Sequence, residues 1–128
     1  MRFLNLAHIL QLHALVTVKF GGASTIRDIG RLEAVVVTQR QEVFGQELYP
    51  TLHEKAAALL RGIIADHPFI DGNKRTAMLA AMTFLELNGQ RITARKGEIE
   101  GFAVTVATNH PPIADIAQWL RCHTEAGA

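Results

Sequence analysis

The chain has 128 residues, of which 48% are apolar and 20% are charged, a composition typical of a globular domain and not of a disordered segment. This length suits a single hydrophobic core, so we expect one domain over residues 1–128. The 13 lysine and arginine residues nearly balance the 12 acidic residues. Such a balance argues against direct binding of nucleic acid, which usually requires a strong basic excess.

The sequence also favours a cytoplasmic protein. Its single cysteine, Cys122, cannot form an internal disulfide, in keeping with a reducing compartment. The apolar stretch from Phe3 to Val18 is interrupted by His8, Gln11 and His13 and is followed by no small-residue cleavage site, so it does not look like a secretory signal. No segment is long and apolar enough to predict a membrane span.

Apolar residues recur at helical spacing along most of the chain, and β signals are weak apart from residues 91–93. The sequence therefore predicts an all-α fold. The first predicted helix ends at Gly21-Gly22, the second begins at Asp28, and Thr51 with Glu54 forms a capping-box pattern for the third. The six predicted helices cover about residues 5–19, 28–42, 51–67, 73–87, 96–107 and a last segment after Pro111-Pro112.

Residues 43–51 lie between two predicted helices and contain Gly45 and Pro50, which favour a loop or a short hairpin. Phe44, Leu48 and Tyr49 give this segment large apolar side chains. Two interpretations stay open, namely a packed loop and an exposed element that binds a partner.

The helix predicted over residues 73–87 is apolar on every face between Ala77 and Met82, a pattern typical of a helix at the centre of a bundle. Pro68 disfavours helical geometry at His67, so the preceding helix should end there. A tight Asp71-Gly72 turn should then lead into the central helix.

The first turn of this central helix contains Asn73, Lys74 and Arg75. Cations are unfavourable there, by about a few tenths of a kcal/mol each, because a helix N-terminus already carries partial positive charge. A bound phosphate would remove the conflict, since the free N–H groups and both cations would converge on it. Gly72 lets the backbone approach a ligand closely, and Asn73 can both cap the turn and donate to a phosphate oxygen.

Two further residues turn this anion site into a candidate reaction site. Asp71 can hold Mg²⁺ through one carboxylate while phosphates supply other ligands. His67 can accept the proton of an incoming hydroxyl, and together the residues suit phosphoryl transfer. The helix C-terminus favours a charged imidazole, whereas Lys74 and Arg75 oppose it, so the sequence leaves the protonation state of His67 open.

Each of these residues also has an ordinary structural interpretation: a helix cap for His67, a turn for Asp71-Gly72, a solvated pair for Lys74-Arg75. Their joint occurrence in nine residues at the start of a buried helix favours function. We expect Phe69 to be an apolar anchor for the loop. The remaining histidines show no metal-ligand spacing and are interpreted as ordinary helix or loop residues: His8, His13, His53, His110 and His123.

Residues 67–75, with the sequence HPFIDGNKR, closely resemble the signature loop HxFx(D/E)(G/A)N(G/K)R of Fic/Doc proteins. Residues 28–34, 49–57 and 84–89 are similar to the death-on-curing branch of that family, and the resemblance covers about residues 5–122. It implies a compact helical bundle with the signature loop between two central helices. It also implies that His67 is the base, that Asp71 binds Mg²⁺, that residues 44–50 align the target protein, and that the nucleotide is held by the loop residues Phe69, Gly72, Asn73, Lys74 and Arg75.

Two positions bear on the reaction. AMP-transferring Fic proteins typically have GNGRxxR, whereas this chain has Lys74 and Met78 in place of the second glycine and second arginine. The death-on-curing branch shares the lysine, and the resemblance implies transfer of the γ-phosphate of ATP to a threonine of elongation factor Tu, which halts translation. Gly72 is more typical of Fic proteins, so AMP transfer and a non-catalytic role in binding nucleotide or a partner stay open as alternatives.

Members of this family are commonly restrained by a glutamate motif, (S/T)xxxE(G/N). The nearest segment, residues 38–42, is followed by Val43 where the motif has glycine or asparagine, so we expect no self-inhibitory helix. The resemblance therefore implies a toxin with a separate antitoxin. We expect that partner to insert a disordered segment that folds as a helix in an apolar groove.

Overall fold

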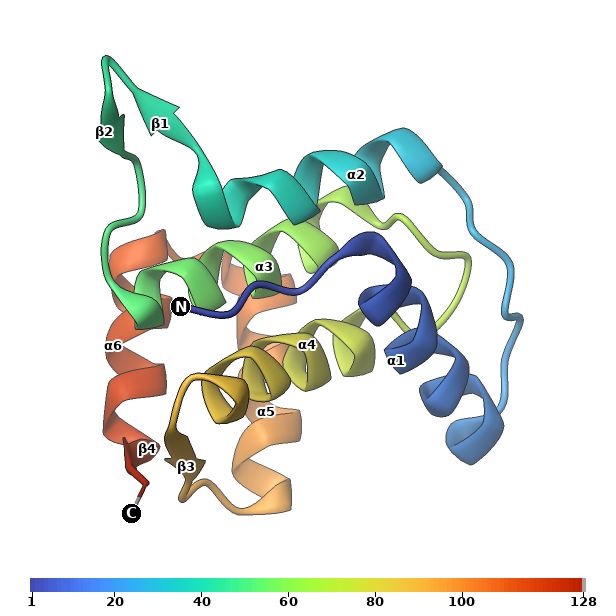
Figure 1. The fold of residues 1–128 in the computed structure, drawn as a ribbon. Coiled ribbons are helices and arrows are strands. Elements are labelled where there is room, and N and C mark those ends of the chain that lie inside the picture. Colours follow the sequence, from blue (N-terminus) through green and yellow to red (C-terminus); the bar gives the residue numbers. More distant parts are fainter. Residues whose placement is uncertain (128) are drawn as a thin grey trace.

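The computed structural model describes residues 1–127, which form six α-helices and two small antiparallel sheets (Figure 1). The prediction of an all-α fold with helices at these six places is confirmed. Among the described residues, no helix is both long enough and apolar enough to cross a membrane. The helices are α1 (Leu6–Phe20), α2 (Ile29–Val37), α3 (Leu52–Asp66), α4 (Asn73–Leu87), α5 (Lys96–Asn109) and α6 (Ile113–Cys122).

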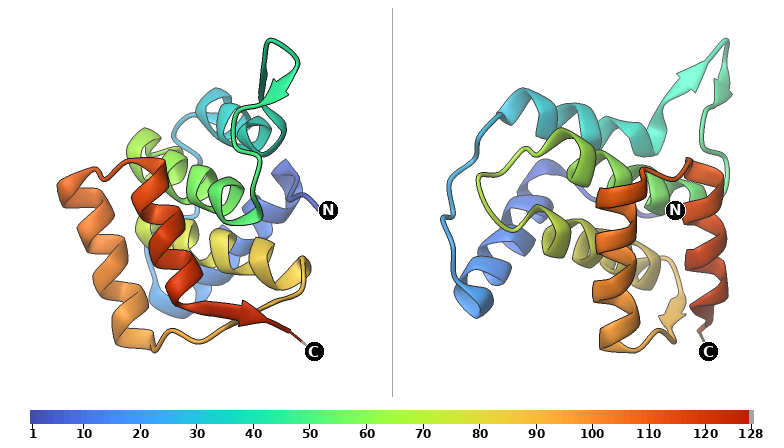
Figure 2. Two further views of the ribbon diagram at one scale, coloured as in Figure 1. Left: turned by 90° about the vertical axis from the view of Figure 1, so that its left-hand side faces the viewer. Right: turned by 180° about the vertical axis from the view of Figure 1, so that it is seen from behind.

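Helices α3 and α4 run in opposite directions through the centre of the molecule (Figure 1). Alanines at their contact let the two backbones approach closely, and larger side chains fill the space around them. Helices α1 and α2 pack on one side of this pair, whereas α5 and α6 cover another (Figure 2). The fully buried residues of the central pair include Ala56, Ala57, Leu59, Leu60, Ile63, Ala77, Ala80, Ala81 and Phe84.

Helix α2 is shorter than predicted, because it ends at Val37 and continues only as a 3₁₀ turn, Thr38–Arg40. The buried side chain of Gln39 explains this end. Its amide accepts a hydrogen bond from the Leu4 N–H (2.8 Å) and donates to the Leu4 carbonyl (2.9 Å). The predicted extension of the helix to residue 42 is therefore wrong, since a contact with the N-terminal segment redirects the chain.

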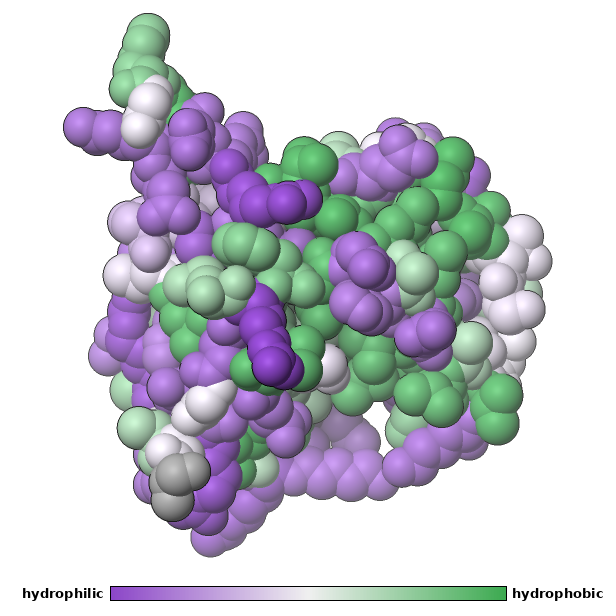
Figure 3. All heavy atoms as spheres, viewed as in Figure 1, coloured by the Kyte–Doolittle hydropathy of each residue, from purple (hydrophilic) through white to green (hydrophobic). Residues whose placement is uncertain are grey.

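Residues 42–47 form an exposed hairpin of strands β1 (Glu42–Val43) and β2 (Gln46–Glu47). Its two turn residues, Phe44 and Gly45, have φ values of 52° and 78°, as a type I′ turn requires. The Phe44 side chain is fully exposed, and the hairpin tip projects from the body as a hydrophobic point (Figure 3). This excludes a packed loop, while binding of a partner here stays a prediction.

The base of this hairpin is tied to α3 by Lys55, whose ammonium group is buried. It donates to the Gln39 carbonyl at 2.9 Å and to the Glu47 carboxylate at 2.9 Å. The weak β signal near residue 91 belongs to strand β3 (Gln90–Ile92), which pairs with an unpredicted strand, β4 (Thr124–Ala126).

Candidate active site

The loop of residues 67–72 joins the two central helices and is anchored to the hydrophobic core. The Phe69 side chain is 1% exposed and stacks on the His13 ring, with centroids 3.7 Å apart and an interplanar angle of 6°. The prediction that Phe69 anchors the loop is confirmed. Because its ring is buried, any contribution of Phe69 to nucleotide binding acts through the shape of the loop.

Asn73 fastens the loop to the start of α4. Its carbonyl oxygen accepts from the Phe69 N–H at 3.1 Å, and its amide nitrogen donates to the Phe69 carbonyl at 2.9 Å. The side chain is 8% exposed. Asn73 thus bonds across the loop as a clasp and does not cap the helix in the usual way. Its predicted contact with phosphate would have to use the second N–H of its side-chain amide.

His13 lies directly beneath the loop, although its sequence position suggested an ordinary helix residue. Its Nε2 lies 2.8 Å from the Asp71 carbonyl oxygen, which can only accept, so Nε2 carries the proton. The ring is 2% exposed. His13 therefore supports the main chain at the predicted metal-binding residue while its ring face supports Phe69.

A second support comes from residues 22–28, which we call the strap. The strap runs beside the loop in both Figure 1 and the right-hand view of Figure 2. The Ala23 N–H donates to the Asp71 carboxylate at 2.9 Å, the Ile70 N–H donates to the Thr25 carbonyl at 3.1 Å, and the Arg27 N–H donates to the Pro68 carbonyl at 2.7 Å. These bonds fix the loop along its whole length.

His67 ends α3 in a left-handed conformation, with φ 46° and ψ 58°. Its side chain is exposed, as a base that must meet a substrate requires. The Arg27 guanidinium donates to the His67 carbonyl (2.7 Å) and to the Asp66 carbonyl (2.9 Å), and the Arg31 guanidinium donates to the Asp66 carbonyl (3.0 Å). Two cations thus donate to the carbonyl groups at the C-terminus of α3, where the helix dipole favours positive charge.

The N-terminus of α4 is open. It begins after Gly72, whose φ of 80° turns the chain, and no side chain caps it. Lys74 is exposed, and the Arg75 guanidinium lies 4.1 Å from the centroid of the Phe20 ring. Since the first N–H groups of a helix lack internal partners, they and these two cations form a ready site for an anion.

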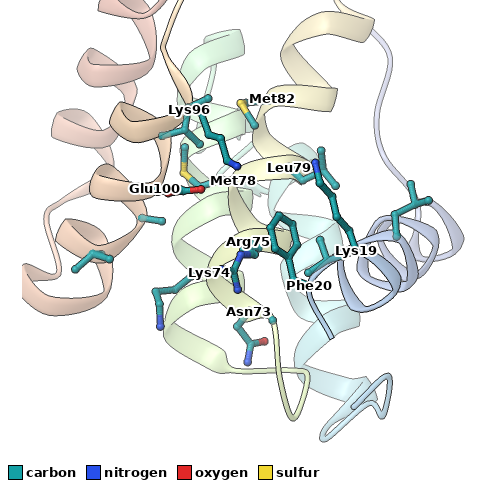
Figure 4. A pocket seen from close by; sticks show the side chains of 16 residues that line it. Lys19, Phe20, Asn73, Lys74, Arg75, Met78, Leu79, Met82, Lys96 and Glu100 are labelled. Carbon is teal, nitrogen blue, oxygen red and sulfur yellow. The ribbon is translucent and has the colours of Figure 1, made fainter. Parts of the chain in front are cut away.

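A cavity of about 820 Å³ adjoins this helix start, between α1, α4 and α5 (Figure 4). Its walls are mostly apolar, and its charged lining consists of four cations against one carboxylate. The cavity explains why Leu79 and Met82, in the middle of an otherwise buried helix, are only partly buried. The charged residues are Lys19, Lys74, Arg75, Lys96 and Glu100.

The residues present suit a metal ion that arrives with a phosphate. The Asp71 side chain is exposed, and one of its oxygens is oriented by the Ala23 N–H. Within residues 1–127, no group of three or more His, Cys, Asp and Glu side chains lies close enough to hold a metal ion. Mg²⁺ at Asp71 would need oxygen ligands from a nucleotide and water, the coordination it usually has beside phosphates.

The comparison with known proteins decides the family. The model of the Fic/DOC family matches residues 3–85. This chain belongs to the Fic/DOC family. Toxin Doc of Mycolicibacterium smegmatis is 46% identical over 78 residues, which are 61% of this chain and 60% of that protein. Protein kinase doc of Escherichia phage P1 is 31% identical over 121 residues, 94% of each chain.

The structure brings the predicted site residues together. His67, Asp71 and residues 72–75 lie on one short loop and the helix turn that follows it. Sequence reasoning missed His13 and Arg27, which support that loop through its main chain. The one signal nearby was Asp28, which indicated a helix start and nothing more.

Proposed function

We propose that this protein is a Doc-type toxin that transfers the γ-phosphate of ATP to a threonine hydroxyl of elongation factor Tu, with Mg²⁺ as cofactor. The open, cationic N-terminus of α4 beside His67 carries this proposal. The likeness to proteins named toxin and protein kinase supports it. Because its target works in translation, we place the protein in the cytoplasm.

Each residue has a defined task under this proposal. His67 takes the proton of the threonine hydroxyl as that oxygen attacks the γ-phosphorus, whose bond to the bridging oxygen breaks to release ADP. Lys74, Arg75 and the first N–H groups of α4 hold the phosphates, and Asp71 holds Mg²⁺, which neutralises phosphate charge. The exposed hairpin of residues 42–47 aligns the target segment, with its base fixed by Lys55.

We further propose that the cavity between α1, α4 and α5 receives the antitoxin. The exposed apolar residues Leu15 and Val104 line it, and its charged lining has a surplus of cations. A helix with one apolar and one acidic face is complementary to such a groove. The charge reversals Lys19→Glu and Lys96→Glu should together weaken the toxin–antitoxin complex, as measured by calorimetry, while leaving phosphoryl transfer by the free toxin in place.

The reaction itself is tested with purified protein, Mg²⁺, elongation factor Tu and ATP labelled at either the α or the γ phosphate. We expect label on the factor from the γ position alone, and none with His67→Ala. Label from the α position would establish AMP transfer, the alternative that Gly72 favours. Absence of label from both positions would direct the search to other acceptor proteins, and absence of transfer to those, with ATP still bound, would indicate a binding protein.

A further inference from the structure

Arg27 stands out among the residues around the loop because it contacts three consecutive carbonyl groups. Its Nη2 donates to Asp66 at 2.9 Å and its Nε to His67 at 2.7 Å, while its own backbone N–H donates to Pro68 at 2.7 Å. These carbonyls flank the side chain of His67 on both sides. One residue from a distant part of the chain thus holds the whole peptide segment that carries the base.

We propose that Arg27 is a positioning residue, which fixes the left-handed backbone of His67 and thereby directs its imidazole toward the substrate. This inference rests on the proposed role of His67 as the base. It gives the strap a part in the reaction that neither the family match nor the names of the relatives state.

The left-handed conformation of His67 is the state that these bonds of Arg27 would stabilise. A φ of 46° is unusual for a residue other than glycine. Pro68 disfavours right-handed helical geometry at the preceding residue and leaves extended geometry as the competing state. A change to extended geometry would turn the His67 carbonyl away from Arg27 and swing the imidazole to another side of the chain. The hydrogen bonds of Arg27 are made only in the left-handed state, so they select it.

Arg31 offers a matched control on the same helix end. Its Nη1 donates to the Asp66 carbonyl at 3.0 Å and its Nε pairs with the Asp28 carboxylate at 3.3 Å, and among the described residues it has no hydrogen bond to His67. Arg27 and Arg31 are both exposed. Replacing either one removes one cation from the end of α3, yet only replacement of Arg27 releases the carbonyl of the base.

The kinetic test compares Arg27→Gln with Arg31→Gln in transfer of phosphate from ATP to the target. We expect Arg27→Gln to lower kcat by about 10- to 100-fold, the loss typical of a misplaced catalytic group, with KM for ATP within about twofold of the wild-type value. Arg31→Gln should retain most of the kcat. Added guanidinium ion should partly restore the kcat of Arg27→Ala. A rise in KM for ATP as large as the loss of kcat would show that Arg27 binds the nucleotide, and would overturn the proposal.

A second measurement does not depend on activity. The three-bond coupling between the amide proton and Hα of His67, together with its Cα chemical shift, reports the backbone conformation in solution. Both should move toward extended values in Arg27→Gln and stay unchanged in Arg31→Gln, with both variants folded. If His67 keeps its left-handed geometry in Arg27→Gln, the proposal is wrong. If the wild-type protein transfers no label but Arg27→Gln still shows this change, the proposed function is wrong while the effect of Arg27 on the His67 backbone stands.

Discussion

Helices α3 and α4 begin in opposite ways, although each has 15 residues and they pack against each other. At the start of α3, the Thr51 hydroxyl accepts from the Glu54 N–H at 3.2 Å and donates to the Glu54 carboxylate at 2.7 Å. At the start of α4, glycine replaces the capping side chain and cations replace the acid. The first arrangement supplies an acceptor from within the helix, whereas the second leaves the first N–H groups to solvent or to a bound anion.

This difference separates two uses of one structural feature. The self-sufficient N-terminus of α3 contributes to stability in every state of the protein. The N-terminus of α4 gives up that contribution and keeps its N–H groups available to a ligand. A residue that destabilises a helix start in the absence of ligand is therefore a better guide to the site than a residue that stabilises it.

The largest expected effect comes from removing both cations at the start of α4. The double variant Lys74→Gln/Arg75→Gln loses charge-assisted contacts worth about 1.5–3 kcal/mol each, so we expect the Kd for ATP to rise more than about tenfold. Titration calorimetry measures it. Lys96→Gln is the control, since it removes a cation that lines the same cavity but belongs to α5. An equal rise in the Kd for ATP in this variant would show that the start of α4 has no special role.

The next effect tests whether the clasp at Asn73 replaces an ordinary cap. Asn73→Ala leaves the buried N–H and carbonyl of Phe69 without their partners, so we expect the free energy of unfolding to fall by about 1–3 kcal/mol. Urea denaturation followed by circular dichroism gives this value. A loss near zero would mean that water takes over both bonds and that the loop needs no clasp.

The start of α3 should affect stability alone. Thr51→Ala removes a side-chain cap and should lower the free energy of unfolding by about 1 kcal/mol, without changing kcat/KM. Thr51→Ser keeps the hydroxyl and should retain most of the stability. A drop in kcat/KM for the alanine variant would show that the two helix starts are coupled.

The cations at the start of α4, which favour ATP binding, should slightly destabilise the protein when no nucleotide is bound. In the absence of nucleotide and at low salt, Lys74→Gln should raise the free energy of unfolding by about 0.3–1 kcal/mol, because the charge opposes the helix dipole. Thermal denaturation in low and high salt measures the gain and its screening. If the variant is less stable at low salt, Lys74 has a structural role that outweighs the dipole.

The smallest effect concerns His53, in the first turn of α3, whose Nε2 lies 2.9 Å from the Thr124 hydroxyl. Burial first, and then the charge of Arg121, lower the pKa of His53 below its ordinary value of 6.5. The unfolded chain therefore binds the proton more readily, so stability from this residue is complete above about pH 6.5 and is lost as the pH falls through the lower folded-state pKa. His53→Gln should have a flatter dependence of unfolding free energy on pH between 7.5 and 5, and equal slopes would contradict this.

Much of this molecule was predictable because its helices bury regular apolar faces. The helical spacing of Leu32, Val35 and Val36, or of Ile116, Ala117 and Leu120, is a local signal, and these residues are buried. The loop residues His67, Asp71 and Lys74 were found because they are adjacent in sequence and chemically distinctive. Local sequence patterns were therefore enough to predict the helices and to find the loop residues.

What the sequence did not predict depends on contacts between distant segments. Strand β4 has no alternation of its own and exists because Gln90–Ile92 lies beside it. Arg27 meets His67 across 40 residues of chain, and His13 meets Asp71 across 58. Both side chains contact carbonyl oxygens, which every residue has, so no residue type marks the partner.

The packing of Gly72 on α1 also bears on how this loop can evolve. A Cβ at position 72 would lie 3.2 Å from the Val16 Cγ1, in a backbone with φ 80°. Alanine at position 72 would therefore crowd Val16 and would also be strained by the backbone conformation itself, whatever the space around it. A side chain at position 72 thus needs two changes together, a smaller residue at position 16 and a backbone outside the left-handed region, so α1 and the loop are coupled in the substitutions that they accept.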